Sequence, residues 1–176
     1  MGHFGTKKQP DINTSEEIMS IKNSDFTNSA EKLLRSNTQD HSYTMLIFDV
    51  NLLGGKQETC TLSDFRALMH YIGSRLTNYV SKPSLFCQIN TNTYAILMRD
   101  IKAVDVALLA ISLTEEANQF LPGYMVKLSF GTCLAEHCKT DIAALLKQAS
   151  YAKSTIGDQN HQILADFNEL ENCKKL

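Results

Sequence analysis

The chain has 176 residues, of which 43% are apolar and 20% are charged, and its formal net charge is −2. This composition supports one globular domain with a sizeable core and excludes a strongly basic nucleic-acid-binding domain. No run of about 18 apolar residues is present, so no membrane-spanning helix is expected. Residues 1–23 are polar and lack the apolar core of a secretory signal. Five cysteines at irregular spacing indicate a reduced compartment rather than a disulfide framework. We therefore expect a cytoplasmic domain without direct membrane insertion, which still permits a membrane anchor elsewhere in a longer parent protein.

The sequence divides into three parts. Residues 1–23 are polar, contain several turn-forming residues and predict a disordered arm or linker, native or left from a vector. Residues 24–170 carry regular apolar patterns and form the predicted domain. Residues 171–176 are charged and predict a tail or the start of a linker to a downstream domain.

The first half of the domain predicts two helices around a central strand. An amphipathic helix is expected from about Ser24, followed by a strand over Tyr43–Val50 that is apolar on both faces and therefore central in its sheet. Residues Asn51–Thr59 predict a loop. Thr61 or Ser63 is then expected to cap a second helix.

The second half predicts a hairpin and two more helices. Two apolar runs, Leu85–Ile89 and Tyr94–Met98, are joined by four polar residues, a pattern typical of a β-hairpin. The later elements are a helix over Ile101–Phe120, a strand over Tyr124–Leu134, a helix from Thr140 to Gly157 and a strand over His161–Ala165. The inward face of the first of these helices is expected to carry Val104, Ala107, Leu108, Ile111 and Phe120.

The order of these elements predicts an α+β domain. We expect a layered fold with a central, mostly antiparallel five-stranded sheet flanked by helices. Its β-α-β-β-α-β part predicts a ferredoxin-like, palm-type core.

The residues alone offer one candidate metal ligand. Asp49 lies near the end of the predicted central strand, where carboxylates often hold Mg²⁺. The alternative is an acidic residue that caps the next turn. The run Gly54-Gly55-Lys56 lacks the other residues of a phosphate-binding loop, and Cys133, His137 and Cys138 lack the second cluster that a zinc site needs.

From Tyr43 onward the sequence resembles the GGDEF domain family of diguanylate cyclases. The strings that carry the resemblance are Phe48-Asp49-Val50-Asn51, Phe86–Met98, Leu128-Ser129-Phe130-Gly131, Leu145–Ala149 and Ala152-Lys153. They occur in the family's order, and the resemblance as a whole covers about 125 residues. The resemblance implies a fold in which two GTP-loaded protomers face each other and make cyclic di-GMP with Mg²⁺.

The resemblance also implies that the signature hairpin has changed. The family's two glycines fall on Asn90 and Thr91, its acidic pair on Asn92 and Thr93, and its phenylalanine on Tyr94. The Cβ atoms of Asn90 and Thr91 would crowd the approach of the backbone to phosphate. A neutral Thr93 cannot replace a metal-binding glutamate.

Other positions of the family's site are only partly retained. The first aspartate of the strand end survives as Asp49, and the second falls on Asn51. The two guanine-reading positions fall on Gln57 and Arg66. The phosphate-binding lysine matches Lys153, although an ungapped alignment places Gly157 there. The stretch Ser81-Lys82-Pro83-Ser84 lacks the Arg-x-x-Asp of the inhibitory product site.

These changes predict a degenerate domain that has lost its chemistry. We expect no catalytic residue, no confident metal site and no cofactor, with Mg²⁺ and GTP bound weakly if at all. Asp49 is then a remnant whose replacement by alanine changes stability by roughly 1 kcal/mol in either direction if its side chain is exposed. The exposed tip Asn90–Thr93 is expected to be a contact surface or a plain solvated turn.

The resemblance implies a regulatory role beside other domains. Asp166–Leu170 resembles the junction that leads into an EAL phosphodiesterase domain, so an attached EAL domain and a homodimer are the expected partners. Two alternatives remain open. One is an active nucleotidyl cyclase whose altered site combines Asp49 with Glu58 or Asp64, and the other is an interaction domain that binds no nucleotide.

Overall fold

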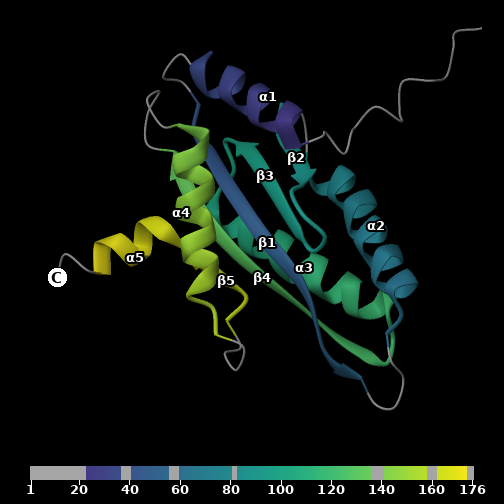
Figure 1. The fold of residues 1–176 in the computed structure, drawn as a ribbon. Coiled ribbons are helices and arrows are strands. Elements are labelled where there is room, and N and C mark those ends of the chain that lie inside the picture. Colours follow the sequence, from purple (N-terminus) through teal and green to yellow (C-terminus); the bar gives the residue numbers. More distant parts are fainter. Residues whose placement is uncertain are drawn as a thin grey trace, which may run out of the picture.

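The computed structural model describes residues 23–36, 41–55, 60–80, 83–135, 141–157 and 162–173. Within them it contains one five-stranded sheet in the order β2-β3-β1-β4-β5 (Figure 1). Only β5 runs parallel to its neighbour, so the predicted α+β class with a mostly antiparallel sheet is confirmed. In chain order the elements are α1 (Asn23–Arg35), β1 (Tyr43–Gly55), α2 (Leu62–Tyr79), β2 (Leu85–Gln88), β3 (Thr93–Arg99), α3 (Ala103–Phe120), β4 (Tyr124–Ala135), α4 (Ile142–Ser154), β5 (Leu164–Asp166) and α5 (Phe167–Cys173).

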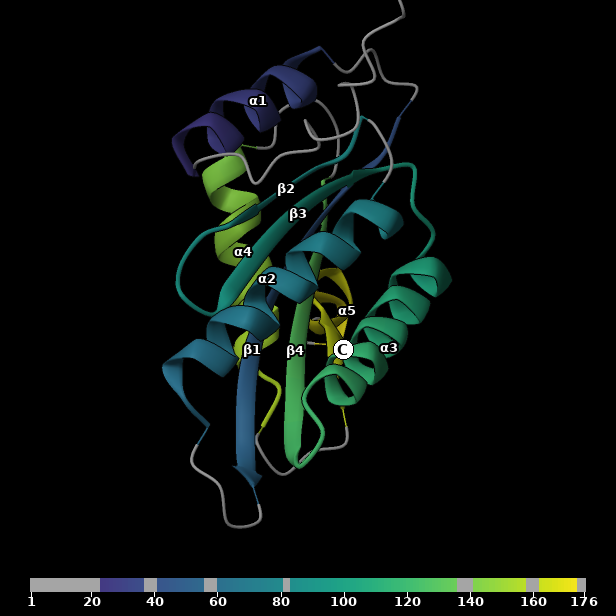
Figure 2. The same ribbon diagram turned by 90° about the vertical axis from the view of Figure 1, so that its right-hand side faces the viewer.

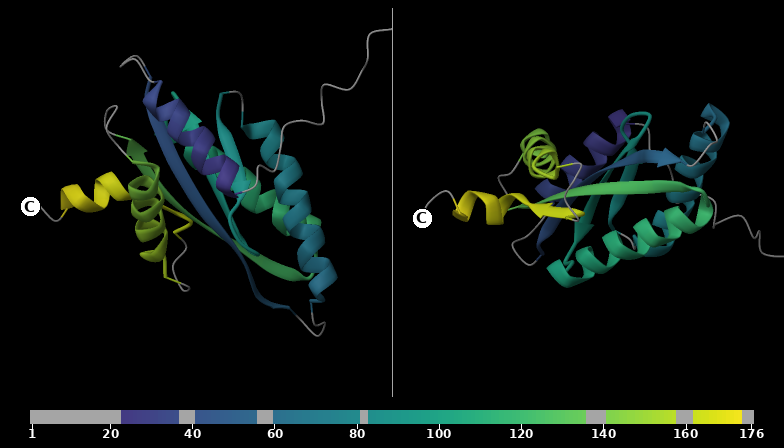
Figure 3. Two further views of the ribbon diagram at one scale, coloured as in Figure 1. Left: turned by 45° about the horizontal axis from the view of Figure 1, so that its top comes forward. Right: turned by 90° about the horizontal axis from the view of Figure 1, so that it is seen from below.

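The sheet is covered on both faces. Side chains of β1 alternate between two cores, with Leu46, Phe48 and Val50 in one and Met45 and Ile47 in the other. Helices α2 and α3 cover the first face, as Figure 2 shows from their side. Helices α1 and α4 cover the second face, and Figure 3 shows α3 and α4 on opposite sides of the sheet. The prediction that β1 is a central strand is therefore confirmed.

Strand β1 is longer than its apolar pattern predicts. The stretch from Asn51 was expected to be a loop, but the strand continues to Gly55. The reason is its neighbour β4, which extends equally far and pairs Asn51 with Lys127 and Leu52 with Val126. Backbone hydrogen bonds to an ordered partner therefore maintain a strand that the side chains alone do not indicate.

The inward face of α3 was predicted wrongly. Val104, Leu108 and Ile111 are 60%, 56% and 45% exposed and form an apolar stripe on the outer surface of the helix. The buried side chains are Val106, Leu109, Ala110, Leu113 and Ala117.

A polar contact explains this rotation of α3. The Asn118 side-chain amide donates to the Val126 carbonyl oxygen at 2.8 Å, and its oxygen accepts from the Val126 backbone N–H at 2.9 Å. These two bonds satisfy backbone groups of β4 and fix which side of α3 faces the sheet.

The helix ends follow local sequence in part. Thr61, one of the two residues predicted as the cap of α2, is the cap, and it forms a capping box with Asp64 that was not predicted. Asp141 caps α4, while Thr140 lies outside the described residues. Phe167–Cys173 form α5, a helix that the sequence did not predict and that continues past residue 170.

Other predictions fall outside the described part of the chain. Of the predicted arm, only Asn23 is described, as the first residue of α1. Cys133 is buried in the sheet, whereas His137 and Cys138 are not described. Within the described residues, no helix is both long and apolar enough to cross a bilayer.

A charged contact links α2 to α3. Arg75 Nε donates to Glu116 Oε2 at 2.7 Å, and the Tyr79 hydroxyl donates to Glu116 Oε1 at 2.8 Å. These bonds lower the pKa of the Glu116 carboxyl below its ordinary value of 4.5, and the bond from Arg75 has the larger effect.

We expect this contact to make the fold sensitive to acid. Because the pKa of Glu116 is lower in the folded state, its contribution is complete above about pH 5 and is lost as the pH falls through the folded pKa. Urea unfolding at a series of pH values should show wild type losing stability below about pH 5 more steeply than Glu116→Gln. Parallel pH profiles for the two proteins would contradict the assignment.

Candidate functional site

The residues of the predicted site that meet in space are Asp49, Thr93 and Lys153, which we call the Asp49 cluster. Asp49 lies opposite Thr93 in the β1–β3 ladder, so their side chains share one face of the sheet. The Thr93 hydroxyl donates to Asp49 Oδ1 at 2.6 Å, and Lys153 Nζ lies 2.6 Å from Asp49 Oδ2. The side chains of Asp49 and Lys153 are 25% and 16% exposed. Both oxygens of the carboxylate are thus bound by groups of the chain itself.

A glycine brings Lys153 to this position. Gly131 on β4 lies under α4, where an added Cβ would overlap the Ala149 carbonyl oxygen and the Lys153 backbone nitrogen. Only a residue without a side chain allows the helix to lie this close to the strand. Of the two positions considered for the phosphate-binding lysine, it is Lys153 rather than Gly157 that lies beside Asp49.

The hairpin tip is tied down more than the sequence predicts. The Val50 N–H donates to the Asn92 carbonyl oxygen at 2.8 Å, and the Asn92 N–H donates to Asn90 Oδ1 at 3.0 Å. Thr93 is only 4% exposed, so the expectation that all four tip residues are exposed is wrong. Asn90 and Thr91 remain exposed, and a contact role for the tip is limited to them.

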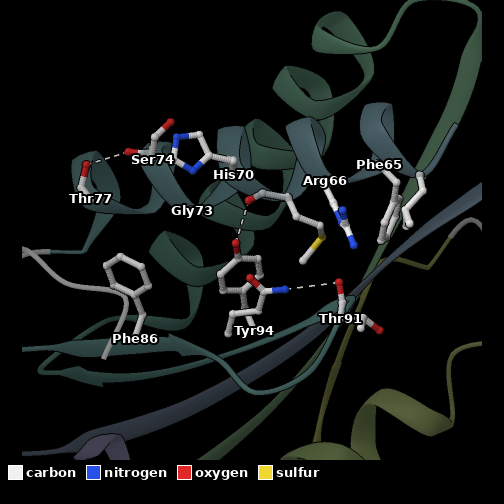
Figure 4. Close-up of a pocket in the computed structure, with 12 residues that line it drawn as sticks. Phe65, Arg66, His70, Gly73, Ser74, Thr77, Phe86, Thr91 and Tyr94 are labelled. Atoms are coloured by element: carbon white, nitrogen blue, oxygen red, sulfur yellow. Dashed lines mark hydrogen bonds between the residues drawn. The ribbon is translucent and has the colours of Figure 1, made fainter. Parts of the chain in front are cut away.

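A groove of about 500 Å³ lies between α2 and the β2–β3 hairpin (Figure 4). It is on the face of the sheet opposite to the Asp49 cluster. Its lining residues are Leu62, Phe65, Arg66, Met69, His70, Gly73, Ser74, Thr77, Phe86, Gln88, Thr91 and Tyr94. The Tyr94 hydroxyl donates to the Met69 carbonyl oxygen at 2.7 Å, and burial raises the pKa of Tyr94 to about 12. Phe65, Met69 and Phe86 give the groove an apolar floor, and polar side chains such as Arg66 lie at its rim. Small-molecule sites commonly have this character.

The remaining predicted residues are distributed between these two places. Thr91, Tyr94 and Arg66 line the groove rather than the Asp49 cluster. Asn51 is partly exposed and pairs with Lys127 along the strand. Gln57 lies outside the described residues. The sequence did not single out Met69, His70 or Phe86, because helical spacing and a short strand mark them only as ordinary core or surface residues.

The described residues do not fit a magnesium site. Among them, no three His, Cys, Asp or Glu side chains are placed to hold one metal ion. Asp49 already faces the Lys153 ammonium, and its register partner Thr93 offers a neutral hydroxyl. Asp64, one carboxylate considered for an altered site, is engaged by Thr61 at the start of α2. Glu58 lies outside the described residues.

Comparison with known proteins identifies the fold. No protein-family model and no curated protein matches the sequence. Solved structures do match. The GGDEF domain of TpbB (YfiN) from Pseudomonas aeruginosa has 17% identity and a TM-score of 0.57, over 86% of this chain and 94% of that one. The active GGEEF domain of a diguanylate cyclase from Vibrio cholerae has 11% identity and a TM-score of 0.58, over 82% and 92%.

A third structure comes from an EAL/GGDEF domain protein of M. capsulatus, with 17% identity and a TM-score of 0.57 over 81% of this chain and 96% of that one. The chain therefore has the fold of a GGDEF domain. At these identities the likeness concerns the fold, and the function has to be argued from the residues.

Proposed function

We propose that the chain is a catalytically inactive GGDEF-like domain that regulates a protein of bacterial cyclic di-GMP signalling. The observation that carries the proposal is the Asp49 cluster. A lysine ammonium lies 2.6 Å from the one strand-end carboxylate that the resemblance retains.

Charge explains why this arrangement disfavours catalysis. Phosphoryl transfer needs metal ions that offset the charge of the triphosphate, and carboxylates hold those ions. The Lys153 ammonium neutralises Asp49 already, so a magnesium ion would have to displace it. Thr93 adds no negative charge and uses its hydroxyl to donate to the same carboxylate. The fold is kept while the carboxylate set that the reaction needs is reduced and neutralised.

The regulatory part of the proposal concerns partners. An attached EAL phosphodiesterase domain is the favoured one, and the neighbour described as an EAL/GGDEF domain protein supports this pairing. We also propose that the domain forms a homodimer and binds GTP weakly. Its proposed location is the cytoplasm. An interaction domain that binds no nucleotide is the alternative, and calorimetric titration with GTP and Mg²⁺ distinguishes the two.

We expect no diguanylate cyclase activity. The purified chain, incubated with GTP and either Mg²⁺ or Mn²⁺, should give no cyclic di-GMP above a buffer control when the products are separated by chromatography. An active diguanylate cyclase under the same conditions is the positive control. Steady turnover that disappears in Asp49→Asn would instead establish the alternative of an active cyclase with an altered site.

A further inference from the structure

The groove between α2 and the hairpin contains an arginine, Arg66, that has no carboxylate partner among the residues the structure describes. The chain has four arginines. Arg35 pairs with Glu31, Arg75 with Glu116 and Arg99 with Asp100. Arg66 has neither an ion pair nor a hydrogen bond with any residue that the structure describes. It is exposed at the rim, and Figure 4 shows its guanidinium reaching from α2 toward the hairpin that carries Thr91.

The other described lining residues add no negative charge to oppose Arg66. His70 lies four residues after Arg66, one turn along the same side of α2, and lines the same groove. No aspartate or glutamate occurs among the described lining residues. The floor is apolar and aromatic, formed largely by Phe65, Met69 and Phe86. A ligand that complements these surfaces has an apolar body and a negatively charged end.

We propose that this groove binds a small organic oxyanion, a carboxylate or a phosphate ester on an aromatic body. The guanidinium of Arg66 donates two parallel hydrogen bonds to the oxyanion, the geometry for which arginine is suited. The aromatic body lies on the floor of the groove near Tyr94 and Phe86. A groove of about 500 Å³ is large enough for a ligand with two fused rings.

Arg66 stands where the family resemblance places a carboxylate that reads guanine, so the groove lacks that means of recognising guanine. A carboxylate at this position of α2 would accept hydrogen bonds from the N–H groups of guanine, whereas Arg66 only donates. The polarity of this part of the groove is therefore inverted relative to the family pattern that the sequence resembles. The inference deepens the proposed function, and it rests on that function only for the view that binding here has a regulatory consequence.

The test uses three probes that share one aromatic body. These are 1-naphthylacetate, 1-naphthyl phosphate and the neutral 1-naphthylacetamide, each titrated into the 176-residue chain and followed by two-dimensional amide NMR. We expect at least one of the anions to shift the amide signals of Thr91 and Tyr94. The neutral amide should bind at least about tenfold more weakly, because it loses the charge-assisted bonds to Arg66. Which anion binds more tightly identifies the class of oxyanion.

Two variants separate charge from shape. Arg66→Gln should weaken anion binding by at least about tenfold, whereas Arg35→Gln, a change at another exposed arginine, should leave it unchanged. Ser74→Phe fills the groove and keeps its charge. The Ser74 hydroxyl donates only within its own helix, to the Tyr71 carbonyl oxygen, so this variant should remain folded and should bind neither anion.

Several outcomes would overturn the inference. They are equal binding of the neutral amide, unchanged binding in Arg66→Gln, binding of neither anion, and signal shifts that map to the exposed stripe of α3 instead of the groove. Failure of this kind would leave the absence of cyclase activity untouched. Conversely, cyclase turnover would refute the proposed function without changing the binding result.

Discussion

Replacing Gly131 with alanine is expected to lower the free energy of unfolding by about 3 kcal/mol. The added methyl group would overlap backbone atoms of α4, the Ala149 carbonyl oxygen and the Lys153 nitrogen. Backbone atoms inside a helix cannot move aside separately as the end of a flexible side chain can, so α4 has to move away from β4. Urea unfolding followed by circular dichroism measures the loss.

Gly123 supplies a matched control for this substitution. Its φ of 96° disfavours a side chain, but an added Cβ there meets nothing within 4 Å. Gly123→Ala should therefore lose only about 1 kcal/mol, through backbone strain alone. Equal losses in the two variants would mean that the close packing of α4 on β4 contributes nothing beyond a general preference for glycine.

Removing the ammonium of Lys153 is expected to lower the free energy of unfolding by about 2 kcal/mol. Lys153→Met keeps most of the apolar stem and leaves the carboxylate of Asp49 three-quarters buried with Thr93 as its remaining partner. Breaking a fully buried pair costs about 3–5 kcal/mol, and the partial exposure of this pair reduces that figure. The earlier expectation of roughly 1 kcal/mol for replacing Asp49 treated it as exposed, and its two partners argue for a larger loss.

A double-mutant cycle tests whether the effect belongs to the pair. Asp49→Asn combined with Lys153→Met should lose about 1–2 kcal/mol less than the sum of the two single changes, because each single change leaves one charged group unpaired. Lys147→Met, on the same helix, provides a control for the loss of one lysine. Additive losses in the cycle would refute a direct interaction between Asp49 and Lys153.

The fold was predictable where side chains alone determine the element. The apolar run over Tyr43–Val50 predicted a strand covered on both faces, and the polar link Asn90–Thr93 predicted a hairpin. The inward face of α3 was not predictable, because the helix carries two apolar stripes. The outer stripe carries Val104, Leu108 and Ile111, and the contact of Asn118 with Val126 helps to select the other face for burial.

The sequence identified individual residues of the candidate site but not that they lie next to each other. The resemblance drew attention to Asp49, Thr93 and Lys153 separately, but no spacing rule connects a strand near the start of the chain with a helix near its end. Their meeting depends on the sheet register and on Gly131, which only the three-dimensional structure reveals. The groove is a similar case, since an exposed arginine acquires meaning only from the aromatic side chains of another segment.

The Asp49 cluster has a consequence for how this domain responds to its surroundings. The fraction of carboxylates that hold a magnesium ion rises with the magnesium concentration until it saturates, and a chelator removes the ion. Lys153 is attached to the chain, so its effective concentration beside Asp49 is set by the fold. The countercharge of this carboxylate is therefore constant across changes in cellular magnesium.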